Sequence, residues 1–199
     1  MSSQQRIGIL GGAFDPVHVG HLILAAEAQE ALALDRIILV PGAQTPLKGR
    51  APGASGEDRL AMLAEAVRHR PDWEVCDWEI RRGGVSYSIH TAAHLQARFP
   101  DALLFWVIGA DQLSRLASWH KIEDLGRLVS FAVALRNGDK LDMPADLPPS
   151  VRVEALPARR IDISSSEVRE RLRAGRPGAD FLVPESVRRF IAANGLYRD

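Results

Sequence analysis

Two histidines lie three residues apart in the segment GGAFDPVHVGH, which covers residues 11–21. The helix that we expect to begin near Val19 or Gly20 presents free N–H groups and the positive end of its dipole, which attract anions. Because residues three apart share one face of a helix, His18 and His21 would both lie beside this end. Two imidazoles there can donate hydrogen bonds to a phosphate whose charge shifts in a transition state. The spacing therefore predicts a phosphate site.

Zinc binding is the main alternative for this histidine pair, because His-x-x-His can ligate zinc. The sequence offers no third ligand with suitable spacing, and its single cysteine, Cys76, excludes a cysteine-rich zinc cluster and an internal disulfide. A plain turn that happens to contain histidines is the other alternative. The glycines fit neither G-x-G-x-x-G nor G-x-x-x-x-G-K-S/T, but Gly11 and Gly12 would let the backbone approach a ligand closely.

A second motif, ISSSEVRERL, covers residues 163–172. Ser164 followed three residues later by Glu167 is typical of a capping box that starts a helix, and capping alone is the simpler interpretation. Arg169 would lie about one turn inside that helix. Serine hydroxyls, free backbone N–H groups and an arginine together can hold a polyphosphate, so this motif is a second candidate phosphate site.

The third motif, WVIGADQLSRLASWH, covers residues 106–120. An apolar strand ends at Gly109, and Asp111 could accept hydrogen bonds from ribose hydroxyls or simply cap the next helix. Trp119 follows an amphipathic helix, so it could stack on a ring from a loop position or lie in the core. Asp111 and Trp119 thus each have a ligand-binding and a structural interpretation.

Alternating strands and helices must position these motifs. Apolar or alternating runs predict strands at residues 6–10, 36–42, 73–80, 102–109, 128–135 and, at an edge, 151–156. Helical spacing predicts helices at 21–34, 57–69, 87–98, 165–174 and 184–194, with short helices from Asp111 and near 121–125. This alternation is typical of an α/β fold. We expect a Rossmann-like, doubly wound parallel sheet with helices on both faces and a C-terminal helical extension.

Ligands on such sheets bind outside the carboxyl ends of the strands, at the switch point. The first motif follows the first strand, and the loops that hold Lys48, Asp111 and Ser164 would converge on the same edge. We therefore expect the motifs to form one site.

Length and composition bound the class of protein. The 199 residues suit a single domain over 1–199, with a helical portion at about 164–199. The 25 basic and 25 acidic residues balance, so no dominant surface for nucleic acid or acidic membranes is indicated. No apolar run approaches the roughly 20 residues that span a bilayer, and MSSQQR lacks the apolar core of a signal peptide. We expect a cytoplasmic protein that binds neither nucleic acid nor a membrane.

Together these motifs resemble the bacterial nicotinate-mononucleotide adenylyltransferases, within the H-x-G-H nucleotidyltransferase superfamily. The likeness covers nearly the whole chain. Its segments are GGAFDPVHVGH (11–21), VPGAQTPLK (40–48), VSYSIHT (85–91), WVIGADQL (106–113), Trp119, ISSSEVRERL (163–172) and VPESVRRFIAANGLY (183–197). H-x-G-H and I-S-S define the superfamily, whereas SYSIHT, Trp119 and the closing segment point to this family.

The family joins ATP and nicotinate mononucleotide to give deamido-NAD and pyrophosphate, with Mg²⁺, in NAD biosynthesis. The residues that the resemblance implies to be catalytic are His18, His21 and Arg169. Those implied to bind ATP are Gly11, Gly12, Ala13, Phe14, His18, His21, Gly109, Asp111, Ile163, Ser164, Ser165 and Arg169. Those implied to bind nicotinate mononucleotide are Lys48, Tyr87, Ser88 and Trp119.

Such chemistry needs no general base, because the attacking phosphate is already ionised at neutral pH. Catalysis would rest on in-line positioning and charge stabilisation. Mg²⁺ would be carried with ATP and need few protein ligands, so no metal-binding residues are expected.

The sequence also leaves alternative acceptor substrates and alternative classes of protein to consider. Within the same chemistry, the acceptor could be nicotinamide mononucleotide or phosphopantetheine. The chain departs from the usual family pattern at Ala13, Thr45, Leu47, Ser88 and His90. A non-catalytic nucleotide sensor is disfavoured by the retained histidines and arginine. A fragment of a class I aminoacyl-tRNA synthetase is disfavoured by the neutral charge and the missing K-M-S-K-S-like loop.

Overall fold

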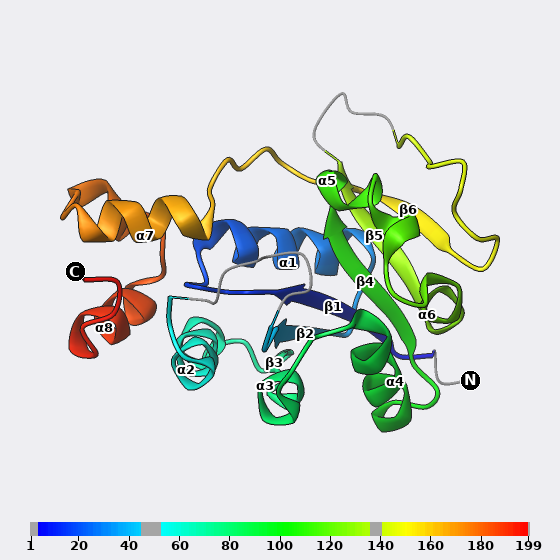
Figure 1. The fold of residues 1–199 in the computed structure, drawn as a ribbon, viewed down its shortest axis with the longest axis horizontal. Coiled ribbons are helices and arrows are strands. Elements are labelled where there is room, and N and C mark those ends of the chain that lie inside the picture. Colours follow the sequence, from blue (N-terminus) through cyan, green and yellow to red (C-terminus); the bar gives the residue numbers. More distant parts are fainter. Residues whose placement is uncertain (1–3, 45–52, 136–140, 199) are drawn as a thin grey trace.

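A computed structural model describes residues 4–44, 53–135 and 141–198, in which six strands form one parallel sheet (Figure 1). The strands are β1 (Arg6–Gly12), β2 (Arg36–Pro41), β3 (Trp73–Val75), β4 (Leu103–Gly109), β5 (Val129–Leu135) and β6 (Arg152–Pro157). Their order is β3-β2-β1-β4-β5-β6, and every neighbouring pair runs parallel. The order reverses between β1 and β4, so the switch point lies directly after β1.

Helices connect the strands on both sides of the sheet. They are α1 (Val19–Ala31), α2 (Gly56–Val67), α3 (Trp78–Arg82), α4 (Ser88–Arg98), α5 (Ala110–Leu113), α6 (Ile122–Leu128), α7 (Ser165–Arg173) and α8 (Glu185–Ala193). Two 3-10 turns, η1 (Leu116–Ser118) and η2 (Pro177–Phe181), complete the described elements. Within the described ranges, no helix has both the length and the apolar character that crossing a membrane requires.

Each face of the sheet has its own apolar cluster. In β4, Val107 belongs to a cluster that includes side chains of α1, α2 and α8, whereas Trp106 belongs to a cluster that includes side chains of α4 and α6. Because both faces are covered, the central strands are apolar at nearly every position rather than at alternate ones. The predicted doubly wound parallel sheet is thereby confirmed, and β6 lies at the predicted edge.

One predicted strand is too long. The strand expected over 73–80 ends at Val75, and Trp78–Arg82 forms α3 instead. The alternation of polar and apolar residues misleads here, because Glu79 is not a solvent-facing strand residue. Its carboxylate is buried and accepts a hydrogen bond from Thr91 of α4, and burial raises the pKa of Glu79. This tertiary contact favours the helical turn over the strand.

The C-terminal helices lie at one end of the molecule beside α2 (Figure 1). Val187 and Ile191 of α8 join Met62 and Leu63 of α2 in one apolar cluster with the sheet. The C-terminal helical portion therefore shares a hydrophobic core with the rest of the fold.

Candidate active site

The loop between β1 and α1 brings the two motif histidines together. His18 is the N-cap of α1 and its side chain is 5% exposed. Its ring stacks on that of His21, with centroids 3.7 Å apart and planes at 30°. The ring of Phe14 lies 4.9 Å from His21 on another side. The helix start, the histidine pair and their common face match the prediction from spacing.

The hydrogen bond of His21 fixes its tautomer. The backbone N–H of His18 donates to Nδ1 of His21 over 3.2 Å. A ring nitrogen that accepts a hydrogen bond carries no proton, so the neutral ring has its proton on Nε2. His21 therefore presents a donor on the side of its ring remote from the backbone.

His18 is held in its neutral form. Burial lowers the pKa of His18 from 6.5 to about 4, and the nearby carboxylate of Glu167 on α7 acts in the opposite direction. Within the described part of the chain, Nδ1 of His18 is buried and has no hydrogen-bond partner. A neutral imidazole in a desolvated place makes stronger hydrogen bonds than it would in water.

Gly20, between the two histidines, leaves room for the ring of His18. A Cβ atom on Gly20 would lie 3.1 Å from Nδ1 of His18 and 3.4 Å from Cγ2 of Ile161. The contact with His18 is tighter than most real Cβ contacts, so a side chain here would require the ring to shift by a few tenths of an ångström. This close approach is one structural reason for a glycine between the two histidines.

A cavity of about 410 Å³ extends from Gly20 to the carboxyl ends of β4 and β5. Its lining includes Gly109 and Asp111, both predicted from the sequence. The residues that the sequence reasoning missed are Gly20, Leu24, Glu27, Ala110, Ala134, Ala158, Arg159 and Ile161. Among these residues, Gly20 could have been identified from the sequence, because it lies inside the H-x-G-H motif. The size lies within the range of small-molecule sites.

Asp111 is not the helix cap that one interpretation proposed. The N-cap of α5 is Gly109, and Asp111 lies in the first turn with its side chain exposed. Oδ2 of Asp111 accepts a hydrogen bond from Nε2 of Gln112 over 2.6 Å. A Cβ atom on Gly109 would lie only 2.5 Å from Oδ1 of Asp111, so the glycine allows the carboxylate to fold over the end of β4.

The second motif docks directly on the first. Oγ of Ser165 donates to the main-chain oxygen of Pro16 over 3.0 Å, and Nη1 of Arg169 donates to that of Asp15 over 2.6 Å. Ser164 caps α7 by accepting from the N–H of Glu167, as predicted. The carboxylate of Glu167 pairs with Arg171 rather than completing a capping box.

Other side chains of the second motif make contacts of their own. Nη2 of Arg169 donates to Oγ of Ser166 over 3.2 Å. Ile163 packs against the apolar cluster beneath α1. The start of α7 therefore faces the loop that carries His18.

A buried arginine that the sequence reasoning did not single out supports this loop. Arg59 of α2 is 2% exposed, and its Nη1 donates to the main-chain oxygens of Ala13 and Gly42 over 2.7 and 2.8 Å. It thereby ties the loop after β1 to the loop after β2. Its position on the helix face of Met62 and Leu63 was a sequence signal for burial.

The residues expected on the acceptor side lie around the start of α4. Tyr87 is the N-cap of α4 and Ser88 its first residue. The ring of Tyr87 lies 4.3 Å from that of His120 and 5.9 Å from that of His90. Burial, followed by charge interactions with Arg82, His120 and Lys121, lowers the pKa of His90.

Trp119 has features of both predicted positions, the loop and the core. It lies just after η1, as a loop residue, but its ring meets Trp106 and Phe131 edge-on at 6.4 and 6.0 Å. Within the described part of the chain, its buried Nε1 has no hydrogen-bond partner. Lys48, Thr45 and Leu47 lie outside the described residues.

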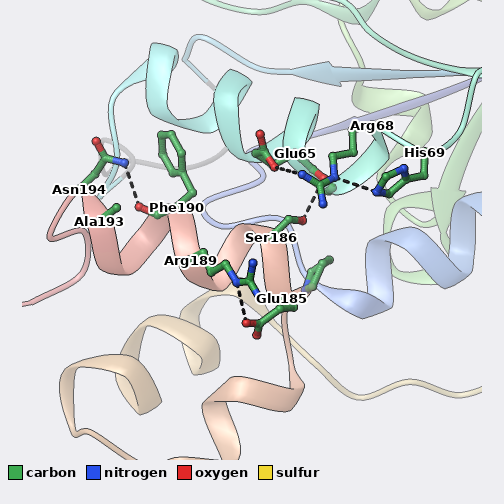
Figure 2. Close-up of a pocket in the computed structure, with 11 residues that line it drawn as sticks. Glu65, Arg68, His69, Glu185, Ser186, Arg189, Phe190, Ala193 and Asn194 are labelled. Carbon is green, nitrogen blue, oxygen red and sulfur yellow. Dashed lines mark hydrogen bonds and ion pairs between the residues drawn. The ribbon is translucent and has the colours of Figure 1, made fainter.

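A second cavity, of about 580 Å³, lies between α2 and α8 and contains none of the predicted site residues (Figure 2). Its charged side chains pair with one another, as Glu65 does with Arg68 and Glu185 with Arg189. Oγ of Ser186 donates to the main-chain oxygen of Glu65. Such mutual pairing leaves the histidine loop as the better candidate site. Within residues 4–44, 53–135 and 141–198, no three His, Cys, Asp or Glu side chains gather as a metal-binding group.

Comparison with known proteins gives consistent matches over the chain. Residues 9–171 match the model of the cytidylyltransferase-like family. A probable nicotinate-nucleotide adenylyltransferase of Opitutus terrae is 44% identical, over 97% of this chain and 98% of that protein. One from Gemmatimonas aurantiaca is 40% identical, over 98% and 93%. The solved Plasmodium falciparum nicotinic acid mononucleotide adenylyltransferase complexed with NaAD has the same fold, with a TM-score of 0.76, 19% identity and 97% coverage of both chains.

The buried neutral state of His18 predicts how stability depends on pH. The folded pKa of about 4 lies below the ordinary 6.5, so the unfolded chain binds a proton first as the pH falls. The contribution is intact above pH 6.5 and is lost progressively down to about pH 4. At about 1.4 kcal/mol per pKa unit, the loss is on the order of 3 kcal/mol.

Denaturant unfolding of the unaltered chain and of His18→Gln, measured between pH 7.5 and 4, tests this expectation. The stability of the unaltered chain should fall more steeply than that of the variant. Parallel curves for the two proteins would contradict the assignment.

The packing of Gly20 predicts that Gly20→Ala displaces the ring of His18. The ring then becomes more exposed, and its pKa should rise from about 4 toward 6.5 in an NMR titration of the imidazole signals. Gly178→Ala is the matched control, because a Cβ atom there meets only Nη1 of Arg171, at 3.5 Å. A pKa of His18 that stays unchanged in Gly20→Ala would show that the glycine has another role.

Proposed function

The chain belongs to the nicotinate-nucleotide adenylyltransferases, and we propose that the loop after β1 and the start of α7 form the phosphate-binding half of its active site. The activity joins ATP and nicotinate mononucleotide to give deamido-NAD and pyrophosphate in NAD biosynthesis. One observation carries the assignment of the site. The second motif donates hydrogen bonds to the loop of the first, which brings serine hydroxyls and an arginine to the loop that carries the two stacked histidines.

The histidines face the reacting phosphate in this proposal. His21 offers the proton on Nε2, and His18 lies stacked beside it at the N-terminus of α1. Both would donate to oxygens of the α-phosphate, where negative charge is redistributed as the pentacoordinate phosphorus forms. The backbone of Gly11, Gly12, Ala13 and Phe14 would follow the triphosphate. Their proximity to the N-terminus of α1 favours an anion.

The start of α7 would hold the leaving group. Ser164, Ser165 and Arg169 would contact the β- and γ-phosphates. Negative charge develops there on the oxygen that bridged the α- and β-phosphates, as its bond to the α-phosphorus breaks and pyrophosphate departs. In the described structure the guanidinium of Arg169 donates to a main-chain oxygen and a hydroxyl and lies 3.4 Å from the Asp15 carboxylate. Its charge is therefore held in position before a phosphate arrives, which reduces reorganisation during the reaction.

The adenosine would occupy the cavity of about 410 Å³ between α1 and the ends of β4 and β5. The exposed carboxylate of Asp111 can accept hydrogen bonds from ribose hydroxyls, and Gly109 lets the ligand approach the end of β4. Nearby, Ile163 would support the phosphate loop through the apolar core.

Nicotinate mononucleotide would bind on the side of Tyr87, Ser88 and Trp119, with Lys48 contacting its phosphate. An oxygen of that phosphate attacks the α-phosphorus in line with the bond to the β-phosphate. The new P–O bond forms as the bond to pyrophosphate breaks. The nucleophile is already ionised, so the protein supplies positioning and charge rather than a base.

The divalent cation of this reaction would be Mg²⁺, entering as the ATP complex. The residues present fit that mode, because the Asp15 carboxylate is already engaged by backbone and side-chain donors. Asp111 then remains as an exposed carboxylate near the cavity. Mg²⁺ commonly keeps several waters and takes few protein ligands when it accompanies phosphates.

We propose that residues 1–199 act as one cytoplasmic domain with ATP and nicotinate mononucleotide as its ligands. The apolar cluster shared by α2, α8 and the sheet supports the single domain. The balance of 25 basic and 25 acidic residues favours small anionic ligands in a local pocket over nucleic acid or a membrane.

A coupled pyrophosphate assay tests the function. The chain, supplied with ATP, Mg²⁺ and nicotinate mononucleotide, should release pyrophosphate and form deamido-NAD. Nicotinamide mononucleotide, assayed in parallel, should give a lower kcat/KM. Absence of product with either mononucleotide, together with measurable ATP binding, would instead favour the nucleotide sensor.

His21→Ala tests the role of the histidine donor. Its hydrogen bond strengthens in the transition state, so kcat should fall by about 10²–10³-fold, with a much smaller change in the KM for ATP. His69→Ala is the control, because His69 is exposed and lines the other cavity. A near-normal kcat for His21→Ala would remove this histidine from the mechanism.

A further inference from the structure

A single buried carboxylate joins several distant segments beside the histidine loop. Asp15 is 3% exposed. Its Oδ2 accepts from the backbone N–H of Gly53 over 2.7 Å, and its Oδ1 accepts from that of Ala54 over 3.0 Å. Oδ2 also lies 3.4 Å from Nη1 of Arg169.

The carboxylate of Asp15 also accepts a hydrogen bond from a residue close to the C-terminus. The hydroxyl of Tyr197 donates to Oδ1 of Asp15 over 2.9 Å. Tyr197 is 7% exposed and follows α8 in the left-handed backbone region, with φ of 59°. Burial, reinforced by Asp15, raises the pKa of Tyr197, so the phenol keeps the proton that it donates.

Gly53 lies beside the other members of this cluster, at ordinary van der Waals distances. A Cβ atom on Gly53 would lie 3.5 Å from Cδ of Arg169, 3.5 Å from Cε1 of Tyr197 and 3.6 Å from Oδ2 of Asp15. Burial lowers the pKa of the Arg59 guanidinium, and the nearby carboxylate of Asp15 acts in the opposite direction. Two segments far apart in the sequence, Gly53–Ala54 and Tyr197, therefore both contact Asp15.

We infer that Asp15 and Tyr197 are positioning residues for the adenylyl transfer, with Tyr197 acting as a latch that fixes the carboxylate and, through it, Arg169 and the histidine loop. The inference rests on the proposed active site. The two oxygens differ in their partners: Oδ1 accepts from Tyr197 and Ala54, whereas Oδ2 accepts from Gly53 and faces Arg169. Without the phenol hydroxyl, Oδ1 keeps one donor, so the orientation of the carboxylate toward Arg169 is fixed less tightly.

This arrangement predicts that loss of the Tyr197 hydroxyl affects kcat rather than substrate binding. Arg169 donates to the main-chain oxygen of the residue whose side chain it also faces, so its guanidinium follows any shift of Asp15. The proposed task of Arg169 is charge stabilisation of the leaving group, which counts most in the transition state. Loss of the latch should lower kcat while leaving the binding of nicotinate mononucleotide nearly unchanged.

Tyr197→Phe is the direct test, because it removes only the hydroxyl. We expect kcat to fall about tenfold, with KM for nicotinate mononucleotide within about twofold of its original value. Ile191→Val is the matched control, since it weakens the packing of buried α8 without contacting Asp15. A kcat for Tyr197→Phe equal to that of the unaltered chain, or lowered no more than in Ile191→Val at equal thermal stability, would overturn the proposal.

A double-mutant cycle separates positioning from simple stabilisation of the C-terminal end. Asp15→Asn should lower kcat further than Tyr197→Phe, and adding Tyr197→Phe to Asp15→Asn should then change kcat little. Effects that multiply independently would show that Tyr197 does not act through Asp15. The unaltered chain is assayed alongside, and its failure to form deamido-NAD would refute the proposed function instead of the latch.

Discussion

Arg169 donates from α7 to the main-chain oxygen of Asp15 across 154 positions of sequence, and the proposed phosphate-binding half of the site depends on this contact. The contact requires the chain to return from the edge strand β6 to the middle of the sheet. Figure 1 shows the segment after β6 passing along α1 before α7 begins. Arg159 in that segment bonds to Glu27 of α1 through its backbone N–H and its guanidinium. This pairing holds the segment against α1 before α7 begins.

The burial of His18 sets the electrostatic character of this place. Desolvation keeps the imidazole neutral, with its pKa near 4, and the unfolded chain is thereby favoured at low pH. The same desolvation strengthens every hydrogen bond made to a phosphate, because less water competes for the donors. Negative charge beside the ring raises its pKa, as Glu167 already does, so binding of an anion and protonation of His18 favour one another. The cost to stability at low pH and the proposed phosphate binding would thus have one physical origin.

The sequence predicted the elements and motifs that are local, and it was weaker where a residue's role depends on distant contacts. The strands after which the motifs lie, the helix start at His18 and the cap at Ser164 follow from short patterns, and the structure has them. The strand expected over 73–80 was wrong beyond Val75, because the buried contact between Glu79 and Thr91 is not visible in an alternating pattern.

Arg59 and Tyr197 were missed for the same reason. An arginine among apolar helix positions indicates burial, but it does not reveal that the partners are carbonyls of two loops. A tyrosine near the end of a chain carries no sign of a carboxylate 182 positions away.

The glycines of the motifs show why the local patterns were nevertheless informative about the site. A Cβ atom on Gly20 would strike the ring of His18, and one on Gly109 would strike the carboxylate of Asp111. In both cases the missing side chain lets a functional group lie against the backbone. Of the two groups only the ring of His18 is also buried, so it is the one whose orientation is fixed before a ligand binds, whereas the exposed carboxylate of Asp111 can move. Since preorganised dipoles stabilise a transition state more effectively than mobile ones, Gly20 would contribute to the proposed catalysis by limiting the movement of His18.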